Sequence, residues 1–152
     1  MKTIALVAHD NRKKDLIEWV EYNYKKLITN KLVCTGTTGK LVKQSLEKNL
    51  KGSQKITEEM VLMKSGPLGG DLQLGAMICE GKIDMLIFFW DPMEPQPHDV
   101  DVKALLRIAV MYNVPTANNR ATADFLITSS LYMSDYQPIL KDYSAYIQRK
   151  IR

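Results

Sequence analysis

The sequence has few of the residues from which metal centres and disulfide frameworks are built. Among its 152 residues are two cysteines and two histidines, with neither CxxC spacing nor an HExxH motif. A structural zinc site usually takes four Cys or His ligands, so this chain has almost nothing from which to build one. Cys34 and Cys79 lie in apolar surroundings, and we expect both side chains to be buried and reduced. We expect any catalysis to proceed without a metal.

Long apolar runs and the common nucleotide-binding motifs are also missing. The longest apolar run, MLIFFW at 85–90, is far shorter than the ~20 residues that cross a bilayer. The N-terminus lacks a small-residue cleavage pattern, and we expect a cytoplasmic protein. Without GxGxxG or GxxxxGK(S/T), neither a nicotinamide cofactor nor a nucleoside triphosphate cradle is indicated. The net charge of +4 is modest and spread along the chain, so a small anionic ligand fits as well as nucleic acid.

The chain does contain a regular alternation of short apolar runs and helix-like segments. The apolar runs lie at 4–8, 31–35, 60–63, 85–90 and 114–117. Each is followed by a loop and then by apolar residues at helical spacing. Strands that are apolar on both faces and alternate with helices predict a parallel sheet covered on both sides. We therefore predict one three-layer α/β domain over 1–152, with a five-stranded, mainly parallel sheet and a polar surface insertion near 47–59.

Loops that follow these runs hold most of the unusual polar residues. In a parallel sheet such loops gather beyond the carboxyl ends of the strands, where α/β proteins bind ligands. TGTTG at 35–39 offers hydroxyls and amides at a helix N-terminus, which is an anion site, although Thr and Gly also cap helices for structural reasons. The predicted anion-binding residues are Lys13, Thr35, Gly36, Thr37, Thr38, Ser65 and Gly66.

Both histidines and several carboxylates fall in the same set of loops. His9 follows the first apolar run and His98 lies in PQPHDVD; the carboxylates are Asp71, Asp91, Asp99 and Asp101. An imidazole titrates near neutrality and can give or take a proton at working pH. Asp99 and Asp101 also suit the first turn of a helix, whereas Asp91 directly follows an apolar strand. An anion pocket beside this cluster suits a phosphorylated substrate that undergoes proton transfer.

These stretches, taken together, resemble the methylglyoxal synthase family. The match rests on ALVAHDNRK, TGTTG, SGPLGGDLQLGAMICEGKIDMLIFFWDP, PHDVDVKALLR and ANNRATADFLI, in this order and spacing. The resemblance implies a cytoplasmic lyase that converts dihydroxyacetone phosphate to methylglyoxal and inorganic phosphate, with no metal or organic cofactor. It also implies a homohexamer of five-stranded α/β domains that inorganic phosphate inhibits.

The resemblance further implies roles for individual residues. The family's catalytic base matches Asp71, and the histidine that acts on the substrate oxygens matches His98. His9, Asp91 and Asp101 match the surrounding polar positions of the pocket. The phosphate-binding positions match the seven anion-binding residues named above. Between Thr38 and Ser65 we expect this chain to be longer than is usual in the family.

Two other hypotheses stay open on the sequence. A non-catalytic effector-binding module, similar to the regulatory domain of large carbamoyl phosphate synthetases, would keep the anion site but need no base or acid. The presence of Asp71, Asp91, His98 and Asp101 together favours the enzyme. A nucleic-acid-associated protein is supported only by the basic charge, and its signature would be strongly salt-dependent binding.

Overall fold

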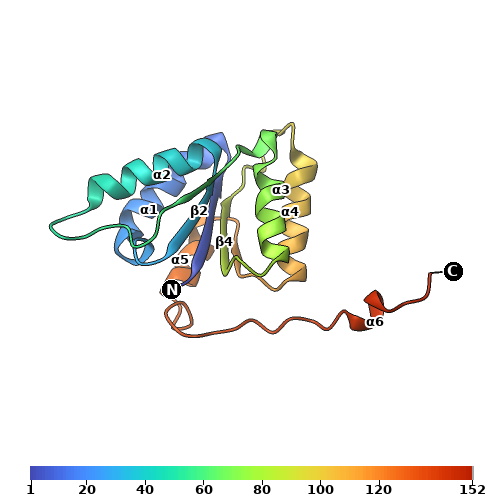
Figure 1. Ribbon diagram of the computed structural model, residues 1–152. Helices are drawn as coiled ribbons and strands as arrows, with labels where there is room; N and C mark the ends of the chain where they lie inside the picture. The colour runs from blue at the N-terminus through green and yellow to red at the C-terminus, as the bar shows by residue number, and fades with distance from the viewer. Residues whose placement is uncertain (152) are drawn as a thin grey trace.

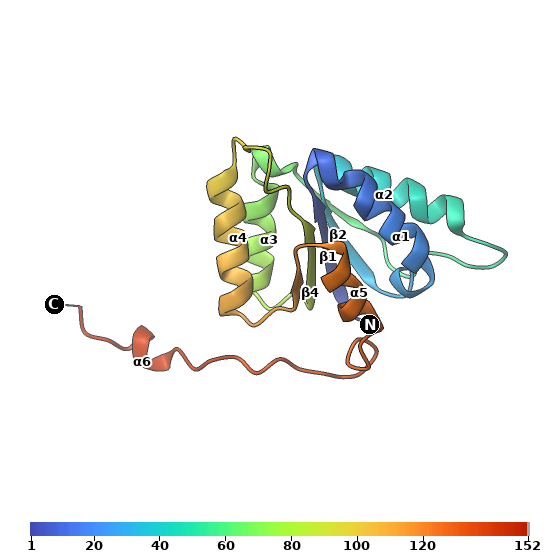
Figure 2. The same cartoon turned by 180° about the vertical axis from the view of Figure 1, so that it is seen from behind.

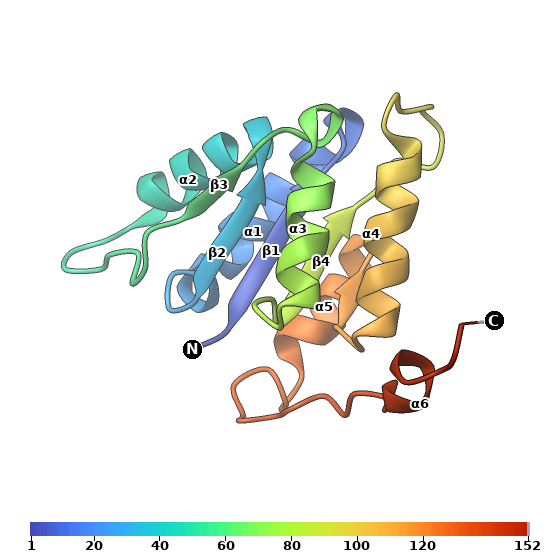
Figure 3. The ribbon, with the colours of Figure 1, turned by 45° about the vertical axis from the view of Figure 1, so that its right-hand side comes forward.

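Five parallel strands form the centre of the computed structural model, which describes residues 1–151. The strands are β1 (Thr3–Ala8), β2 (Lys31–Thr35), β3 (Val61–Met63), β4 (Met85–Phe89) and β5 (Thr116–Ala117). Their order across the sheet is β3-β2-β1-β4-β5, and each neighbouring pair is parallel. Figure 3 shows the sheet behind two of the helices. The predicted five-stranded parallel sheet is confirmed.

Helices cover both faces of this sheet (Figures 1 and 2). On one face lie α1 (Lys13–Leu27), α2 (Gly36–Asn49) and α5 (Arg120–Thr128); on the other lie α3 (Gly70–Cys79) and α4 (Asp99–Met111). The 3-10 turns η1 (Asp10–Arg12) and η2 (Gly66–Leu68) precede α1 and α3, and a short helix, α6 (Ser144–Ile147), lies near the C-terminus. No helix within residues 1–151 combines the length and the apolar character needed to cross a membrane.

The strand residues divide between two hydrophobic cores. Ile4, Leu6 and Ala8 of β1 belong to the core under α1, α2 and α5, whereas Ala5 and Val7 belong to the core under α3 and α4. The residues of β4 alternate in the same way between the two cores. Because successive strand residues point to opposite faces, a strand that is buried on both sides needs an unbroken apolar run. The apolar runs of the sequence therefore account for the three-layer arrangement.

The fifth strand is shorter than its apolar run predicted. The run covers 114–117, but β5 contains only Thr116 and Ala117. Pro115 has no N–H to donate to the ladder, although its carbonyl accepts a hydrogen bond from Leu86 N at 2.9 Å. Since β5 lies at the edge of the sheet, a proline beside it is tolerated.

The prediction that both cysteines are buried is wrong for Cys79. Both thiols are free, but Cys34 is buried in β2 whereas Cys79 is exposed at the end of α3. Leu74 and Ile78 face the sheet from α3, and the next residue lies about 100° further round the helix. Burial raises the pKa of the Cys34 thiol to about 12.

The segment 47–59 forms the last turn of α2 and an exposed loop. Most of its side chains face solvent. Two contacts attach the loop to the body: Thr57 N donates a hydrogen bond to Ile28 O at 2.9 Å, and Ile56 packs against the core under α1. Whether this segment is an insertion relative to other family members stays a prediction.

After Tyr132 the chain leaves the body and continues as the C-terminal arm, residues 133–151 (Figure 1). Tyr132 itself is buried, and its hydroxyl accepts a hydrogen bond from Asn30 Nδ2 at 2.9 Å. Further along, Ile139 O accepts a hydrogen bond from Asn113 Nδ2. The arm nevertheless exposes large apolar side chains; Ile139, Ile147 and Ile151 are 85%, 76% and 90% exposed.

The strand order places a crevice beside β1. In chain order, β2 and β3 are added on one side of β1, and the next strand, β4, is added on the other side of β1. At such a reversal the loops after the two adjacent strands separate to opposite faces and leave a crevice at their carboxyl ends. Ala8 pairs with Phe89, so the loops beginning at His9 and Trp90 border this crevice.

Gly70→Ala should destabilise the fold, because the loop before α3 folds back tightly on itself. A Cβ at Gly70 would lie 2.0 Å from Lys64 O and 3.0 Å from Ser65 O. We expect the free energy of unfolding, measured in urea, to fall by about 1–3 kcal/mol, as for other overpacked sites.

The matched control is Gly75→Ala in the middle of α3, where an added Cβ meets no atom within 4 Å. Helix propensity predicts a gain of about 1 kcal/mol for this control. Equal stabilities of the two variants would contradict the proposed packing.

Candidate active site

A cavity of about 300 Å³ opens at the carboxyl ends of β1, β2 and β3. Its lining comes from four segments that are distant in sequence: the loop after β1, the start of α2, the loop between β3 and α3, and the loop before α4. The lining residues are Val7, Ala8, His9, Asp10, Lys13, Thr35, Gly36, Thr37, Thr38, Ser65, Gly66, Pro67, Asp71, Gln96 and His98. The structure therefore brings together all seven predicted anion-binding residues with Asp71, His9 and His98.

One end of the cavity is the N-terminus of α2. The helix begins at Gly36, whose N–H donates a hydrogen bond to Lys64 O at 3.2 Å. The amides of Thr37 and Thr38 follow in the first turn, where N–H groups have no acceptor within the helix. Thr38 is buried, and its hydroxyl oxygen lies 3.3 Å from Ala8 O, to which it donates. Free amides, hydroxyls and the helix dipole make this end suitable for an anion.

The loop that carries Ser65 packs directly against this helix start. Gly36 has a φ of +39°, and a Cβ there would lie 2.6 Å from Ser65 Cα. Glycine is therefore required both by the backbone conformation and by the close approach of the two loops. This packing places Ser65 and Gly66 beside the amides of α2.

Lys13, the first residue of α1, supplies a positive charge at the same end. Its ammonium group pairs with the carboxylate of Asp10, which also lines the cavity. The side chain of Lys13 is only 19% exposed, whereas that of Asp10 is 92% exposed. The hydrogen bond and charge of Lys13 lower the pKa of Asp10. Because its partner is in solvent, Lys13 can exchange this carboxylate for a bound anion.

The cavity also holds a carboxylate that has no hydrogen-bond partner among the described residues. Asp71, the second residue of α3, is 1% exposed, and among the described residues neither carboxylate oxygen has a donor. Its Oδ2 lies 3.5 Å from His98 Nε2. Burial raises the pKa of Asp71; the charge of His98 opposes this shift and that of Asp101 adds to it. A desolvated carboxylate is a stronger base than one in water.

The absence of a side chain at Gly66 allows the loop between β3 and α3 to pass close to His98 and Asp71. A Cβ at Gly66 would lie 2.6 Å from His98 Nε2 and 3.3 Å from Asp71 Oδ2. His98 occupies the N-cap position of α4, and its buried Nδ1 has no partner within residues 1–151. The imidazole therefore presents one nitrogen to Asp71 and keeps the other free for a ligand or a water molecule.

His9 lies at the end of β1 with its ring almost perpendicular to that of His98. The two ring centroids are 5.6 Å apart. His9 Nδ1 accepts a hydrogen bond from the backbone N–H of Asp91 at 3.1 Å, while Nε2 is buried with no partner among the described residues. Burial and then the charge of His98 lower the pKa of His9, which favours the neutral imidazole.

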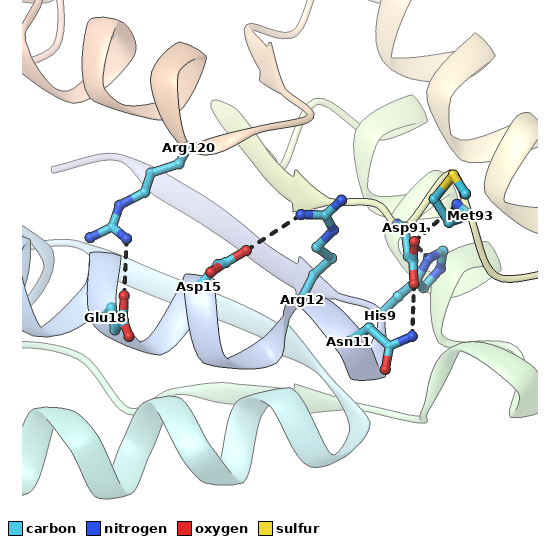
Figure 4. A network of polar contacts seen from close by, with 8 residues as sticks. All are labelled: His9, Asn11, Arg12, Asp15, Glu18, Asp91, Met93 and Arg120. Carbon is cyan, nitrogen blue, oxygen red and sulfur yellow. Dashed lines mark hydrogen bonds and ion pairs between the residues drawn. The ribbon is translucent and has the colours of Figure 1, made fainter.

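Asp91 and Asp101 are close to the site but are not among the lining residues of the described cavity. The Asp91 carboxylate accepts hydrogen bonds from Asn11 Nδ2 and from the backbone of Met93, both at 3.0 Å (Figure 4). These bonds, that of Met93 first, lower the pKa of Asp91. Asp101 lies in the first turn of α4 and acts on Asp71 through its charge. Both were predicted to be catalytic, and neither side chain lines the described cavity.

Sequence reasoning missed three polar residues of the site. Gln96 and Asp10 line the cavity, and Asn11 holds the Asp91 carboxylate. Asp10 and Asn11 directly follow His9, and Gln96 lies two residues before His98. Their positions beside the histidines were a usable signal, but polar residues are so common in loops that sequence alone does not separate them from solvent-facing neighbours.

The described site has no arrangement suited to a protein-bound metal. Within residues 1–151, no three His, Cys, Asp or Glu side chains come together in a way that could hold a metal ion. The polar groups of the cavity are instead amide and ammonium donors at one end and a carboxylate with two imidazoles at the other. This arrangement can bind a small phosphorylated molecule and transfer a proton at its other end.

Comparisons with known proteins show the family to which the chain is related. The family model described as an MGS-like domain matches residues 15–118. The chain is 57% identical to a methylglyoxal synthase of Maridesulfovibrio salexigens, with 99% of this chain and 98% of the relative covered. It is 55% identical to that of Coxiella burnetii, with 99% of both chains covered. The crystal structure of the Elizabethkingia anophelis methylglyoxal synthase superposes with a TM-score of 0.87 at 49% identity, covering 99% of this chain and 93% of that one. The chain belongs to the methylglyoxal synthase family.

Proposed function

We propose that the protein is a carbon–oxygen lyase that converts dihydroxyacetone phosphate to methylglyoxal and inorganic phosphate through an enediolate. The observation that carries this proposal is the buried Asp71 carboxylate, which has no hydrogen-bond donor among the described residues and lines the same cavity as the predicted anion-binding residues. The family relationship supports the same reaction. An assay with purified protein and dihydroxyacetone phosphate should release methylglyoxal and phosphate in equal amounts without added metal.

The phosphate of the substrate would occupy the N-terminus of α2. The residues proposed to bind it are Lys13, Thr35, Gly36, Thr37, Thr38, Ser65 and Gly66. The amides and Lys13 neutralise the charge that the phosphate carries, and they stabilise the further charge that develops as it departs. Because free phosphate fits the same groups, we expect it to inhibit as a product.

Asp71 would remove a proton from the hydroxymethyl carbon of the substrate, which lies on the other side of the carbonyl from the carbon that bears the phosphate ester. The electrons of that C–H bond form the double bond of an enediolate, and its negative oxygen is stabilised by hydrogen bonds from the imidazoles of His98 and His9. The electrons of the enediolate then expel the phosphate by cleaving its C–O bond. The resulting enol of methylglyoxal gains a proton at its methylene carbon and loses the proton of its hydroxyl group to give the product, and Asp71 is free again once it has passed its proton on.

The orientation of the phosphate decides between elimination and isomerisation. An enediolate loses phosphate only when the C–O bond lies out of the molecular plane, aligned with the π electrons. The anion site is built on two packed loops, those of Gly36 and Ser65, and can therefore hold the phosphate in one fixed direction. Fixed geometry of this kind supplies much of an enzyme's rate enhancement.

A non-catalytic binding module accounts less well for this geometry. A buried carboxylate without donors costs folding free energy and repels an anion in the same cavity. A protein that only binds a phosphate-type ligand would gain affinity and stability by replacing Asp71. Retention of a destabilising group is expected at a catalytic site instead.

The cellular setting and the assembly remain part of this proposal. We propose a cytoplasmic, metal-free and cofactor-free enzyme of one domain over 1–152, with 47–59 as a polar surface insertion. We also propose a homohexamer, which is supported by the exposed apolar side chains of the C-terminal arm. Soluble monomers rarely expose so many large apolar residues on one extended segment. A second copy of this chain is the partner that would cover them.

Asp71→Asn should abolish most turnover while leaving phosphate binding nearly unchanged. A general base contributes about 10²–10⁴-fold to the rate, so we expect kcat to fall by at least about 10²-fold. Steady-state kinetics and phosphate titration by calorimetry measure the two effects. A variant with close to full turnover would remove Asp71 as the base.

Stability provides the control for this variant. The pKa of Asp71 is raised in the folded state, so its contribution to stability is complete below the unfolded pKa of about 3.9 and is lost as the pH rises through the folded pKa. Wild type should therefore lose stability relative to Asp71→Asn as the pH rises above about 4, the pKa of the unfolded chain. Urea unfolding at several pH values checks this, and a parallel pH dependence of both proteins would show that Asp71 is not desolvated.

Lys13→Met should weaken substrate binding. A hydrogen bond to a charged group is worth about 1.5–3 kcal/mol, so we expect KM to rise about ten- to hundredfold. Lys14→Met is the matched control, because the neighbouring Lys14 is exposed and is not among the lining residues of the described cavity. Equal KM values for the two variants would contradict the phosphate site.

Replacing two apolar side chains of the C-terminal arm should lower the number of copies in the assembly. In Ile139→Ser/Ile147→Ser, two side chains that are 85% and 76% exposed lose the apolar area that would be buried between copies. Light scattering after gel filtration should give a hexamer for wild type and smaller species for the variant. Tyr22→Ser, which changes an 86% exposed residue of α1, serves as the control. A wild-type monomer would refute the proposed assembly.

A further inference from the structure

His9 is held in one protonation form by a backbone hydrogen bond. Its Nδ1 accepts the N–H of Asp91 at 3.1 Å, and a ring nitrogen that accepts a hydrogen bond carries no proton. In a neutral imidazole the proton must then be on Nε2. Among the described residues Nε2 is buried and has no partner, and His9 lines the cavity. His9 is therefore arranged as a donor toward a ligand.

The peptide that donates this bond is fixed by its own side chain and by Asn11. Asp91 Oδ1 accepts a hydrogen bond from Met93 N, and Oδ2 accepts one from Asn11 Nδ2, both at 3.0 Å (Figure 4). Asn11 lies in η1, two residues after His9. The side chain of Asn11 thus connects the loop after β1 to the loop after β4. These are the two loops that border the crevice beside β1.

We propose that Asn11 is a positioning residue: through Asp91 it holds His9 as a neutral imidazole that donates from Nε2 to a substrate oxygen. This inference rests on the proposed lyase reaction, in which negative charge develops on an oxygen of the enediolate. A neutral donor of fixed direction stabilises that charge without transferring its own proton to the intermediate. Asn11 does not line the cavity and makes no direct contribution to substrate binding.

The charges around His9 come from every neighbouring element. His98 at the start of α4 and Lys13 of α1 lower the pKa of His9, in addition to burial; Asp91 after β4 and Asp10 of η1 raise it. Asn11 partly offsets the Asp91 carboxylate by donating to it. A carboxylate at position 11 would repel Asp91, loosen the turn that fixes its N–H and add negative charge near the ring. Each of these changes favours the protonated imidazole.

Asn11→Asp and Asn11→Ala test the inference. For both variants we expect kcat to fall about tenfold, as for the loss of one well-placed hydrogen bond, with KM changed less than twofold. Nitrogen-15 NMR of the imidazoles, assigned with a His9→Gln variant, should show a neutral Nε2–H form of His9 in the wild type. In Asn11→Asp we expect a mixture of tautomers and a titration that begins at higher pH.

Asn49→Asp is the matched control for the change of amide to carboxylate, since Asn49 bonds to Ser45 O at the end of α2. It should leave both kcat and the His9 nitrogen shifts unchanged. If the imidazole nitrogen shifts and the titration of His9 in Asn11→Asp are the same as in the wild type, the inference is wrong, whatever the value of kcat. A wild type without any turnover would instead refute the proposed reaction, and the NMR of the ligand-free protein would still decide whether Asn11 sets the state of His9.

Discussion

The close packing of one loop against the starts of α2 and α4 is the constraint on which the site depends. The loop from Lys64 to Gly70 contacts Gly36 at the start of α2 and reaches His98 at Gly66. A methyl group at Gly36 or Gly66 would push the loop away from these neighbours, and one at Gly70 would collide with Lys64 of the loop itself. The same loop brings Ser65 to the start of α2 and leads directly into Asp71 of α3, and both residues line the cavity. A shift of this loop would therefore disturb substrate binding and proton transfer together.

The cavity holds a positive charge on Lys13 and a carboxylate on Asp71, and the surroundings of the two groups differ. Lys13 pairs with Asp10, whose carboxylate is in solvent, so the ammonium group can accept a second anion. Asp71 is buried and without a donor, so its negative charge is destabilised until it takes up a proton. The fold bears the free-energy cost of this carboxylate. The cores above and below the sheet, which bury nearly all of β1 and β4, supply the stability that offsets it.

The two histidines have different environments and so different capacities. His98 faces the Asp71 carboxylate at 3.5 Å, and this contact suits a group that exchanges protons with the base. His9 is buried beside His98, which lowers its pKa and favours a neutral ring, and the peptide N–H of Asp91 bonds to its Nδ1, so the ring suits a fixed donor. Asp91 directly follows an apolar strand, a position that predicted a catalytic role. Its carboxylate instead bonds to Asn11 and Met93, and its backbone N–H bonds to His9 and fixes the imidazole.

Periodicity and loop composition alone predicted the parallel sheet, the helices on both faces and the loops that carry the site, because apolar alternation and glycine or threonine at strand ends act locally. The ten residues that were predicted from TGTTG, SGP-x-GGD and the two histidine loops, and that line the cavity, were found in the same way. The short β5 beside Pro115 and the exposure of Cys79 also follow from local features, the missing N–H of proline and the helical period of α3. Tertiary packing decided the turn of the Asp91 carboxylate toward Asn11 and the part played by Asn11. Both of these depend on the hydrogen bond between Asn11 and Asp91, which are 80 positions apart in the sequence. No local sequence pattern predicts a contact between residues so far apart.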